Sequence, residues 1–169
     1  MPREPIPTWF FALVDVRDDQ GRFLLVHELK HGQTWSLPGG RVELGETLVA
    51  GALRETLEES GVRPVLEGIL RIEQTPSAHH TRFRVFFQAH PDETHGGLEA
   101  VPDDESFETA WVGIDDVVQY PLRGDEVRRV LHYVAGGGPI MPLAFLTLEG
   151  DPWHLPASSE DCGQEFKPL

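Results

Sequence analysis

The chain opens with two apolar runs of the kind that form β-strands. Residues Trp9–Val16 and Phe23–His27 are rich in aromatic and β-branched side chains, which favour strands. Between them, Asp18–Gly21 carries the Asp and Gly residues that are common in turns. The pattern therefore predicts two strands that pair as a hairpin.

The stretch from Leu48 to Ser60 is predicted to be a helix. It contains no proline and is dominated by strong helix formers. Thr47 can cap its start, and Gly61 can end it in the left-handed conformation. At about 100° per residue, the mostly apolar stripe that we expect to face the core consists of Val49, Ala52, Leu53, Thr56 and Leu57.

The rest of the chain predicts three more strands and a second helix. Strand-like runs lie at 65–73, 82–89 and 107–112, and apolar residues recur at helical spacing over Gly124–Val134. Gly and Pro recur from residue 136 onward. We predict a domain over 1–135 with a Gly/Pro-rich extension, 136–169, packed on the same domain. The sequence also allows the extension to reach a homodimer partner or to close over a substrate.

Three glutamates share one face of the predicted helix. Glu55, Glu58 and Glu59 are spaced i, i+3 and i+4, where like charges repel one another by a few tenths of a kcal/mol. A hard divalent cation would relieve this repulsion, and Mg2+ commonly binds carboxylates together with substrate phosphates. On helix spacing alone, a solvated charged face is the simpler interpretation.

The segment before the helix changes that balance. Ser36–Arg41 is a Gly-rich turn, and glycines let the backbone approach a ligand closely. A loop that enters a helix also offers free N–H groups to anions. The Gly-Gly pair, the basic residue, Glu46 and the acidic helix face are specific only in combination.

Together these features resemble the Nudix box, GX5EX7REUXEEXGU, in which U is aliphatic. Residues 40–62 read GRVELGETLVAGALRETLEESGV, and every glycine and charged position of the pattern matches. Thr56 stands where the family usually has Ile, Leu or Val, and we expect only a small effect on stability. The box covers 23 of the 169 residues, and flanking features extend the likeness over about Trp9 to Val134.

The resemblance implies a fold, an activity and a metal site. The implied fold is the α/β Nudix fold, an α/β/α sandwich with a mixed β-sheet, and the implied enzyme is a Nudix pyrophosphohydrolase. The implied metal ligands are Glu55, Glu58 and Glu59, with the carbonyl of Gly40 or Gly39 as a backbone ligand. The expected cofactor is Mg2+, with Mn2+ as the alternative.

The resemblance also suggests roles for other charged residues. Arg54 is expected to orient the box carboxylates, and Glu46 to secure the loop. Either Glu59 or an acidic residue in a later loop would deprotonate the attacking water. Glu105 is the first candidate for that loop residue and Glu108 the second, and a solvated acidic loop explains both equally well.

Substrate contacts are expected on both sides of the box. Gly39 and Gly40 are expected to let the backbone approach the substrate. Arg41 occupies a position from which similar proteins contact substrate phosphate. Arg82 and Arg84 share one face of a predicted strand and could either clamp phosphate or pair with nearby acids. Trp35 lies just before the Gly-rich loop and could stack on a base, although packing in the core is the default role of a tryptophan.

Composition narrows the class of protein. The chain is long enough for one domain with a sizeable core. Its formal charge of −14 argues against a surface that binds nucleic acid. A single cysteine, Cys162, is typical of a reducing compartment, and no long apolar run indicates a signal peptide or a membrane span. We therefore expect a cytoplasmic protein with no membrane partner.

The expected reaction is hydrolysis of a nucleoside diphosphate linked to a group X. A nucleoside tri- or diphosphate is the first candidate, partly because residues 122–127 look like those of bacterial Nudix phosphatases. The alternatives are ADP-ribose, a nucleotide sugar, a dinucleoside polyphosphate, thiamine pyrophosphate or an RNA cap, the last disfavoured by the charge. A catalytically silent Nudix-fold nucleotide-binding module and an interaction protein with an acidic helix are the competing classes.

Overall fold

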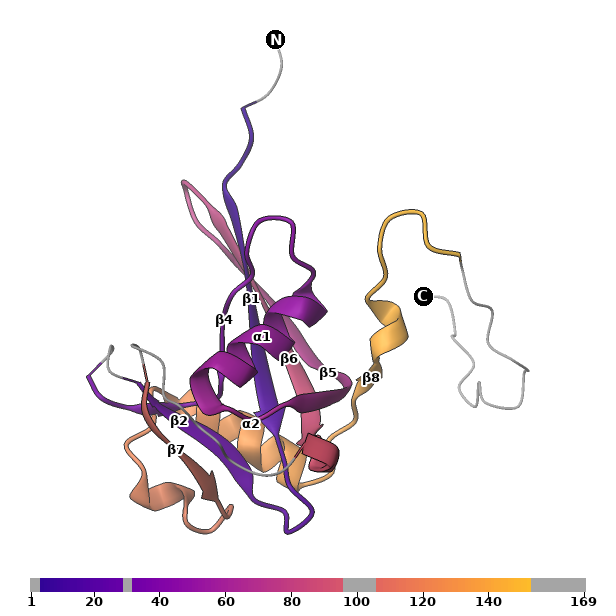
Figure 1. Cartoon of the computed structure of the whole chain (residues 1–169). Helices are drawn as coiled ribbons and strands as arrows, with labels where there is room; N and C mark the ends of the chain where they lie inside the picture. The colour runs from indigo at the N-terminus through magenta and orange to yellow at the C-terminus, as the bar shows by residue number, and fades with distance from the viewer. Residues whose placement is uncertain (1–3, 29–31, 96–105, 153–169) are drawn as a thin grey trace, which may run out of the picture.

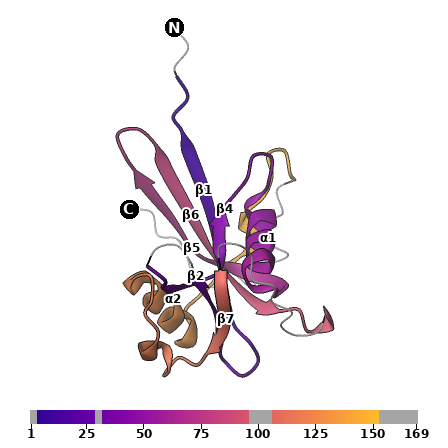
Figure 2. The ribbon, with the colours of Figure 1, turned by 60° about the vertical axis from the view of Figure 1, so that its left-hand side comes forward.

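Two helices lie on opposite sides of a set of strands (Figures 1 and 2). The structure is a computed structural model, and it describes residues 4–28, 32–95 and 106–152. Its elements are β1 (Thr8–Val16), β2 (Phe23–Glu28), β3 (Trp35–Ser36), β4 (Gly39–Arg41), α1 (Leu48–Ser60), β5 (Pro64–Pro76), β6 (Thr81–Pro91), η1 (Glu93–His95), β7 (Ser106–Val112), η2 (Val117–Gln119), α2 (Asp125–Ala135), β8 (Met141–Pro142) and η3 (Leu143–Phe145). Within these ranges no helix is both long and apolar enough to cross a bilayer.

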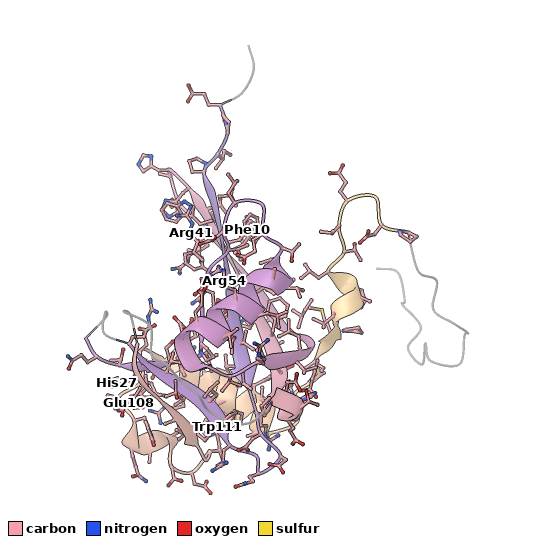
Figure 3. All side chains as sticks on the ribbon, in the orientation of Figure 1. Phe10, His27, Arg41, Arg54, Glu108 and Trp111 are labelled. Atoms are coloured by element: carbon pink, nitrogen blue, oxygen red, sulfur yellow. The ribbon has the colours of Figure 1, made fainter. Side chains whose placement is uncertain are left out.

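The strands form two sheets. The larger has the order β4-β1-β6-β5-β8, in which β1 and β6 are parallel and the other pairs are antiparallel. The smaller, β3-β2-β7, is antiparallel, and His27 of β2 lies opposite Glu108 of β7 (Figure 3). This arrangement confirms the predicted α/β fold with a mixed sheet.

The predicted hairpin of the first two strands is wrong. β1 pairs with β6 along its whole length and with β4 on its other edge, so both of its hydrogen-bonding edges are occupied. β2 belongs to the smaller sheet. The backbones of the two strands meet at their turn, through a bridge between Arg17 and Phe23 and hydrogen bonds from the Arg22 backbone and side chain to Asp18.

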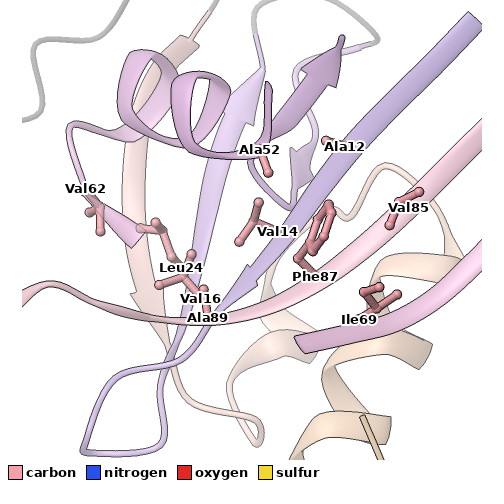
Figure 4. Packing of buried hydrophobic residues seen from close by; sticks show 10 residues of the cluster. All are labelled: Ala12, Val14, Val16, Leu24, Ala52, Val62, Ile69, Val85, Phe87 and Ala89. Carbon is pink, nitrogen blue, oxygen red and sulfur yellow. The ribbon is translucent and has the colours of Figure 1, made fainter. Parts of the chain in front are cut away.

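Alternate residues of β1 feed two separate hydrophobic clusters. Ala12, Val14 and Val16 point to the side of α1 and pack with Ala52 of that helix (Figure 4). Leu13 points to the other side and packs against a second cluster. Helix α2 contributes three buried residues to that cluster, Val127, Leu131 and Val134. The helices therefore cover opposite faces because β1 is apolar on both.

Helix α1 begins and ends where the sequence predicts. The Thr47 side chain accepts a hydrogen bond from the Ala50 N–H, and Gly61 is left-handed with φ of 68°. The predicted buried stripe is partly wrong, because Leu53 and Leu57 are each 37% exposed. The helix instead buries its small and hydroxyl-bearing residues, which allow a close approach to the sheet. These are Gly51, Ala52, Thr56 and Ser60.

The described part of the C-terminal extension contacts the larger sheet. β8 pairs with β5 through Gly68 and Ile69, and a Cβ at Gly68 would lie only 2.7 Å from the Met141 carbonyl oxygen. Leu143 and Leu146 pack against the cluster beneath α1. The extension therefore continues the sheet by one short strand.

One charged side chain is buried in the sheet. Asp15 of β1 is 1% exposed, and neither carboxylate oxygen has a hydrogen-bond partner among the described residues. Burial raises the pKa of this carboxyl from 3.8 to about 8, although the positive charge of Arg17 opposes the shift. Because the folded pKa lies above the unfolded one, folding binds a proton between these two values, and stability falls as pH rises through that window.

We therefore expect Asp15→Asn to stabilise the protein increasingly from pH 5 to pH 8. One unit of pKa shift corresponds to about 1.4 kcal/mol, so the variant should gain more than about 1 kcal/mol over the wild type across this range. Urea unfolding of both proteins at several pH values measures the difference. A difference that does not change with pH would contradict this assignment.

Candidate functional site

A cavity of about 1160 Å³ lies on the sheet face that α2 covers. Its apolar lining comes from β1, β6, α2 and the segments on both sides of β4, and consists of Phe11, Leu13, Leu37, Val42, Leu44, Phe86 and Val127. Its charged lining is drawn from five elements and their loops, and consists of Arg41, Arg82, Arg84, Arg123, Glu28, Glu43, Glu55, Glu59, Asp125 and Glu126. The cavity therefore combines an apolar floor with both signs of charge.

Glu55 reaches this cavity past a residue that has no side chain. A Cβ on Gly40 would lie 2.5 Å from the Glu55 carboxyl carbon, so the carboxylate occupies the space that the glycine leaves. Partial burial raises the pKa of Glu55, and the hydrogen bond and charge of Arg54 oppose that shift. A partly desolvated carboxylate at a cavity wall is well suited to bind a cation.

Glu59 is fixed by the neighbouring glycine. Its Oε2 accepts a hydrogen bond of 2.8 Å from the Gly39 N–H. Gly39 has φ of +145°, and a Cβ there would lie 2.3 Å from the Ala12 carbonyl oxygen. The expectation that this segment leads directly into the helix is wrong, because residues 39–41 form β4 and α1 begins only at Leu48. Of the N–H groups expected to be free for anions, that of Gly39 already donates to Glu59.

Arg54 connects the helix to the segment before it (Figure 3). Its guanidinium donates to Glu46 twice at 2.9 Å, to Glu55 at 2.8 Å and to Glu58 at 2.9 Å. It also donates to the Arg41 carbonyl oxygen at 3.2 Å. These hydrogen bonds lower the pKa of Glu46. One cation thus holds three carboxylates that would otherwise repel one another.

The donor set fits a hard cation in chemistry. Glu55 and Glu59 both line the cavity with carboxylate oxygens, the ligands that Mg2+ prefers. Glu58 is half exposed and is turned toward Arg54. Across the described ranges, no three acidic, His or Cys side chains converge as a ready-made metal cluster. The structure therefore supplies two carboxylates in the cavity lining, and a third on the same helix that pairs with Arg54.

The two arginines of β6 share a face, as the sequence predicts, but differ in their partners. Arg84 forms ion pairs with Glu73 of β5 and with Glu126 of α2. Arg82 has no ion pair among the described residues, and its guanidinium carbon lies 6.0 Å from the ring centre of Phe11. Of the two roles considered for these arginines, Arg84 thus pairs with acids, whereas the guanidinium of Arg82 lines the cavity without an acidic partner among the described residues.

Other candidate residues lie away from the cavity. Trp35 is 7% exposed, stacks on His27 at 4.7 Å between ring centroids and meets Tyr120 edge-on at 5.0 Å, so it packs in the core. Glu108 is exposed on β7, with an oxygen 3.5 Å from the His27 Nδ1. The candidate base Glu105 lies outside the described residues.

The cavity also contains residues that the sequence alone did not indicate. Glu28 at the end of β2 binds Arg123 at 2.7 Å, although the two are 95 residues apart. Asp125 and Glu126 come from the first turn of α2. In the sequence they stand out only as part of residues 122–127, which look like those of bacterial Nudix phosphatases. A pair of acids at a helix start is favourable at any helix N-terminus and by itself indicates no site.

Comparison with known proteins gives consistent matches. The NUDIX domain family matches residues 9–133. A MutT-like protein of Streptomyces ambofaciens is 33% identical over 80% of this chain and 82% of its own length. A NUDIX hydrolase from Nitrosomonas europaea has the same fold, with a TM-score of 0.70 at 24% identity over 84% of this chain and 97% of its own.

One further match is to a much longer protein. A nucleoside triphosphate pyrophosphatase/Nudix hydrolase fusion protein of Bifidobacterium longum is 39% identical over 51% of this chain. The matching region spans only 17% of the length of that fusion protein. This likeness therefore concerns one part of the fusion protein.

Gly39→Ala should destabilise the fold strongly. The new Cβ would meet the backbone of Ala12 and Leu13 and would force a β-carbon into a positive φ. We expect a loss of about 2–4 kcal/mol in the free energy of unfolding. In the matched control Gly113→Ala, the nearest atom is a carboxylate oxygen of Asp116 at 3.3 Å, so the change should stay within about 0.5 kcal/mol. Equal losses in chemical denaturation would refute this reading of Gly39.

Proposed function

The chain belongs to the NUDIX family and is a Nudix pyrophosphohydrolase, and from this premise we propose that it cleaves nucleoside triphosphates or diphosphates with Mg2+. The proposal is supported chiefly by one observation. Beside Gly39 and Gly40, Glu55 and Glu59 lie on the wall of a cavity that several arginines also line. Carboxylates for a cation and arginines for phosphates thus lie side by side.

The chain's own residues divide the work in this proposal. Glu55, Glu58 and Glu59 are the metal ligands, together with the Gly40 carbonyl oxygen. Mg2+, when bound, neutralises the negative oxygens of a diphosphate and so favours attack by water. Mn2+ is the alternative ion, because it takes the same oxygen ligands.

Proton transfer falls to a carboxylate at or near the cavity. Glu59 is the base favoured by the described geometry, because it lines the cavity and is held in place by the Gly39 N–H. Glu105 is the other candidate. Arg41 is placed to contact a substrate phosphate, because it lines the cavity directly after Gly40.

The substrate could belong to one of several classes of nucleotide. The first candidate is a nucleoside triphosphate, and the alternatives are ADP-ribose, a nucleotide sugar and a dinucleoside polyphosphate. A catalytically silent nucleotide-binding module is the competing class. Such a module would keep the cavity but would show no turnover, and it would usually lack one of the box glutamates. All of these glutamates are present in this chain, which favours an active enzyme.

Release of phosphate or pyrophosphate from a nucleotide panel tests this proposal. The panel should contain canonical and oxidised triphosphates, diphosphates, ADP-ribose, nucleotide sugars and dinucleoside polyphosphates. We expect turnover of one class, lost in EDTA and reduced at least about 100-fold in Glu59→Gln. Tight nucleotide binding with no turnover of any substrate by folded protein would favour the silent binding module.

Gly40→Ala tests whether the position of Glu55 matters for the reaction. The added Cβ must push the flexible carboxyl group of Glu55 aside, since the two would overlap at 2.5 Å. Displacing a ligand by about 1 Å can cost a factor of about 100 in rate, so kcat should fall by one to two orders of magnitude. The thermal midpoint should change little, because a side-chain end rather than backbone is displaced.

Gly113→Ala serves again as the control, since it adds a methyl group at a residue that does not line the cavity. It should keep wild-type kcat. If Gly40→Ala retained wild-type kcat while its added methyl was accommodated, Glu55 would not be a ligand.

A further inference from the structure

Two of the four arginines that line the cavity are neutralised by the protein itself. Arg84 is held by Glu126 at 2.5 and 2.6 Å and also by Glu73. Arg123 is held by Glu28 at 2.7 Å. These pairs join α2 and the loop before it to the strands, so both arginines maintain the shape of the cavity.

The other two arginines lack such partners. Within residues 4–28, 32–95 and 106–152, neither Arg41 nor Arg82 forms an ion pair. Each lies near a ring of β1 instead. The guanidinium carbon of Arg41 lies 5.7 Å from the ring centre of Trp9, and that of Arg82 lies 6.0 Å from that of Phe11.

Sheet register places both side chains on the same face. Arg41 of β4 lies opposite Phe11 of β1, and Arg82 of β6 lies opposite Trp9 of β1. Because side chains alternate along a strand, Trp9, Phe11 and both arginines point to the cavity side. β4 and β6 flank β1, and the two arginines lie opposite β1 residues that are two positions apart, so their Cα atoms are about 12 Å apart.

The order of groups across the cavity is also fixed. Glu55 and Glu59 lie against Gly40 and Gly39 of β4, and Arg41 follows directly on the same strand. Arg82 lies two strands farther from these carboxylates. A substrate whose scissile diphosphate lies at the carboxylates and Arg41 would therefore reach Arg82 only with a group beyond that diphosphate.

The positive charge of Arg41 and Arg82 stands out in this acidic protein. The chain carries a formal charge of −14, and two acids of the cavity lining, Glu126 and Glu28, are already paired with Arg84 and Arg123. Two uncompensated guanidinium groups on one concave face repel each other, and an anion would relieve that repulsion. Guanidinium groups bind phosphate through paired hydrogen bonds, so a phosphoryl group is the anion that fits.

We propose that Arg82 forms a subsite for a phosphoryl group beyond the scissile diphosphate, which itself lies at Arg41 and the carboxylates. The substrate then carries a chain of at least three phosphoryl groups, as in a nucleoside triphosphate or a dinucleoside polyphosphate. A diphosphate joined to a neutral sugar leaves Arg82 unused. This inference rests on the proposed function, because it concerns the same cavity.

Steady-state kinetics of Arg82→Gln on three substrates provide the first test. We expect KM for ATP and for diadenosine tetraphosphate to rise about tenfold or more, because a charged hydrogen-bonding partner is lost. KM for ADP-ribose and kcat for each substrate should change less than about twofold. Arg82→Lys should recover part of the loss, because it keeps the charge without the paired geometry. Arg129→Gln, a change of an exposed arginine on α2, should match the wild type.

Equal changes for ATP and ADP-ribose, or no change for ATP, would overturn the subsite while leaving the proposed function intact. A rise in KM for ATP alone, with diadenosine tetraphosphate unaffected, would assign the subsite to the terminal phosphate of a triphosphate. A rise for both would assign it to any third phosphoryl group.

A binding measurement separates the subsite from the reaction. In a Glu59→Gln background, calorimetry with inorganic tripolyphosphate and pyrophosphate reports affinity whether or not the protein turns over any nucleotide. Arg82→Gln should weaken tripolyphosphate about tenfold and pyrophosphate less than about threefold. If Arg82→Gln weakens the binding of both anions equally, the subsite is wrong even if the wild-type protein is an active enzyme. If it weakens only tripolyphosphate binding and the wild-type protein turns over no nucleotide, the subsite is supported and the proposed function fails.

Discussion

The ionic hub around Arg54 is the interaction on which the site depends. A single guanidinium holds Glu46, Glu55 and Glu58, and it also reaches the Arg41 carbonyl oxygen. Without it, three carboxylates would face one another with no compensating charge. Because its partners lie on α1, on the segment before α1 and on β4, the same residue fixes the helix against the edge strand that carries the two glycines.

The glycines turn this arrangement into a site. Gly39 brings β4 so close to β1 that no β-carbon fits, and its N–H orients Glu59. Gly40 leaves the space through which the Glu55 carboxylate reaches the cavity. Ion pairs of Arg84 and Arg123 hold the opposite wall. The protein thus uses arginines in two ways, as internal braces and as open cationic groups that face the cavity.

Local features were predictable from the sequence, and long-range pairings were not. The ends of α1 follow from Thr47 and Gly61, whose effects are local, and the shared face of Arg82 and Arg84 follows from strand alternation. The partners of Arg84 come from β5 and α2, which no spacing rule connects. The predicted hairpin was wrong because a turn signal shows where the chain reverses but not which strand occupies each edge. Leu53 and Leu57 are exposed because contact with the sheet selected small residues for the inner face of α1.

The central claim is that Glu55 and Glu59 bind a divalent cation at the cavity wall. The most direct measurement is a crystal structure grown with Mn2+, in which anomalous scattering locates the ion independently of any assumption about activity. We expect a peak within bonding distance, about 2.2 Å, of oxygens of both carboxylates, with Arg54 still bound to Glu46. A peak elsewhere, or no peak at saturating Mn2+ with Glu59 still bound to the Gly39 N–H, would rule out this cation site.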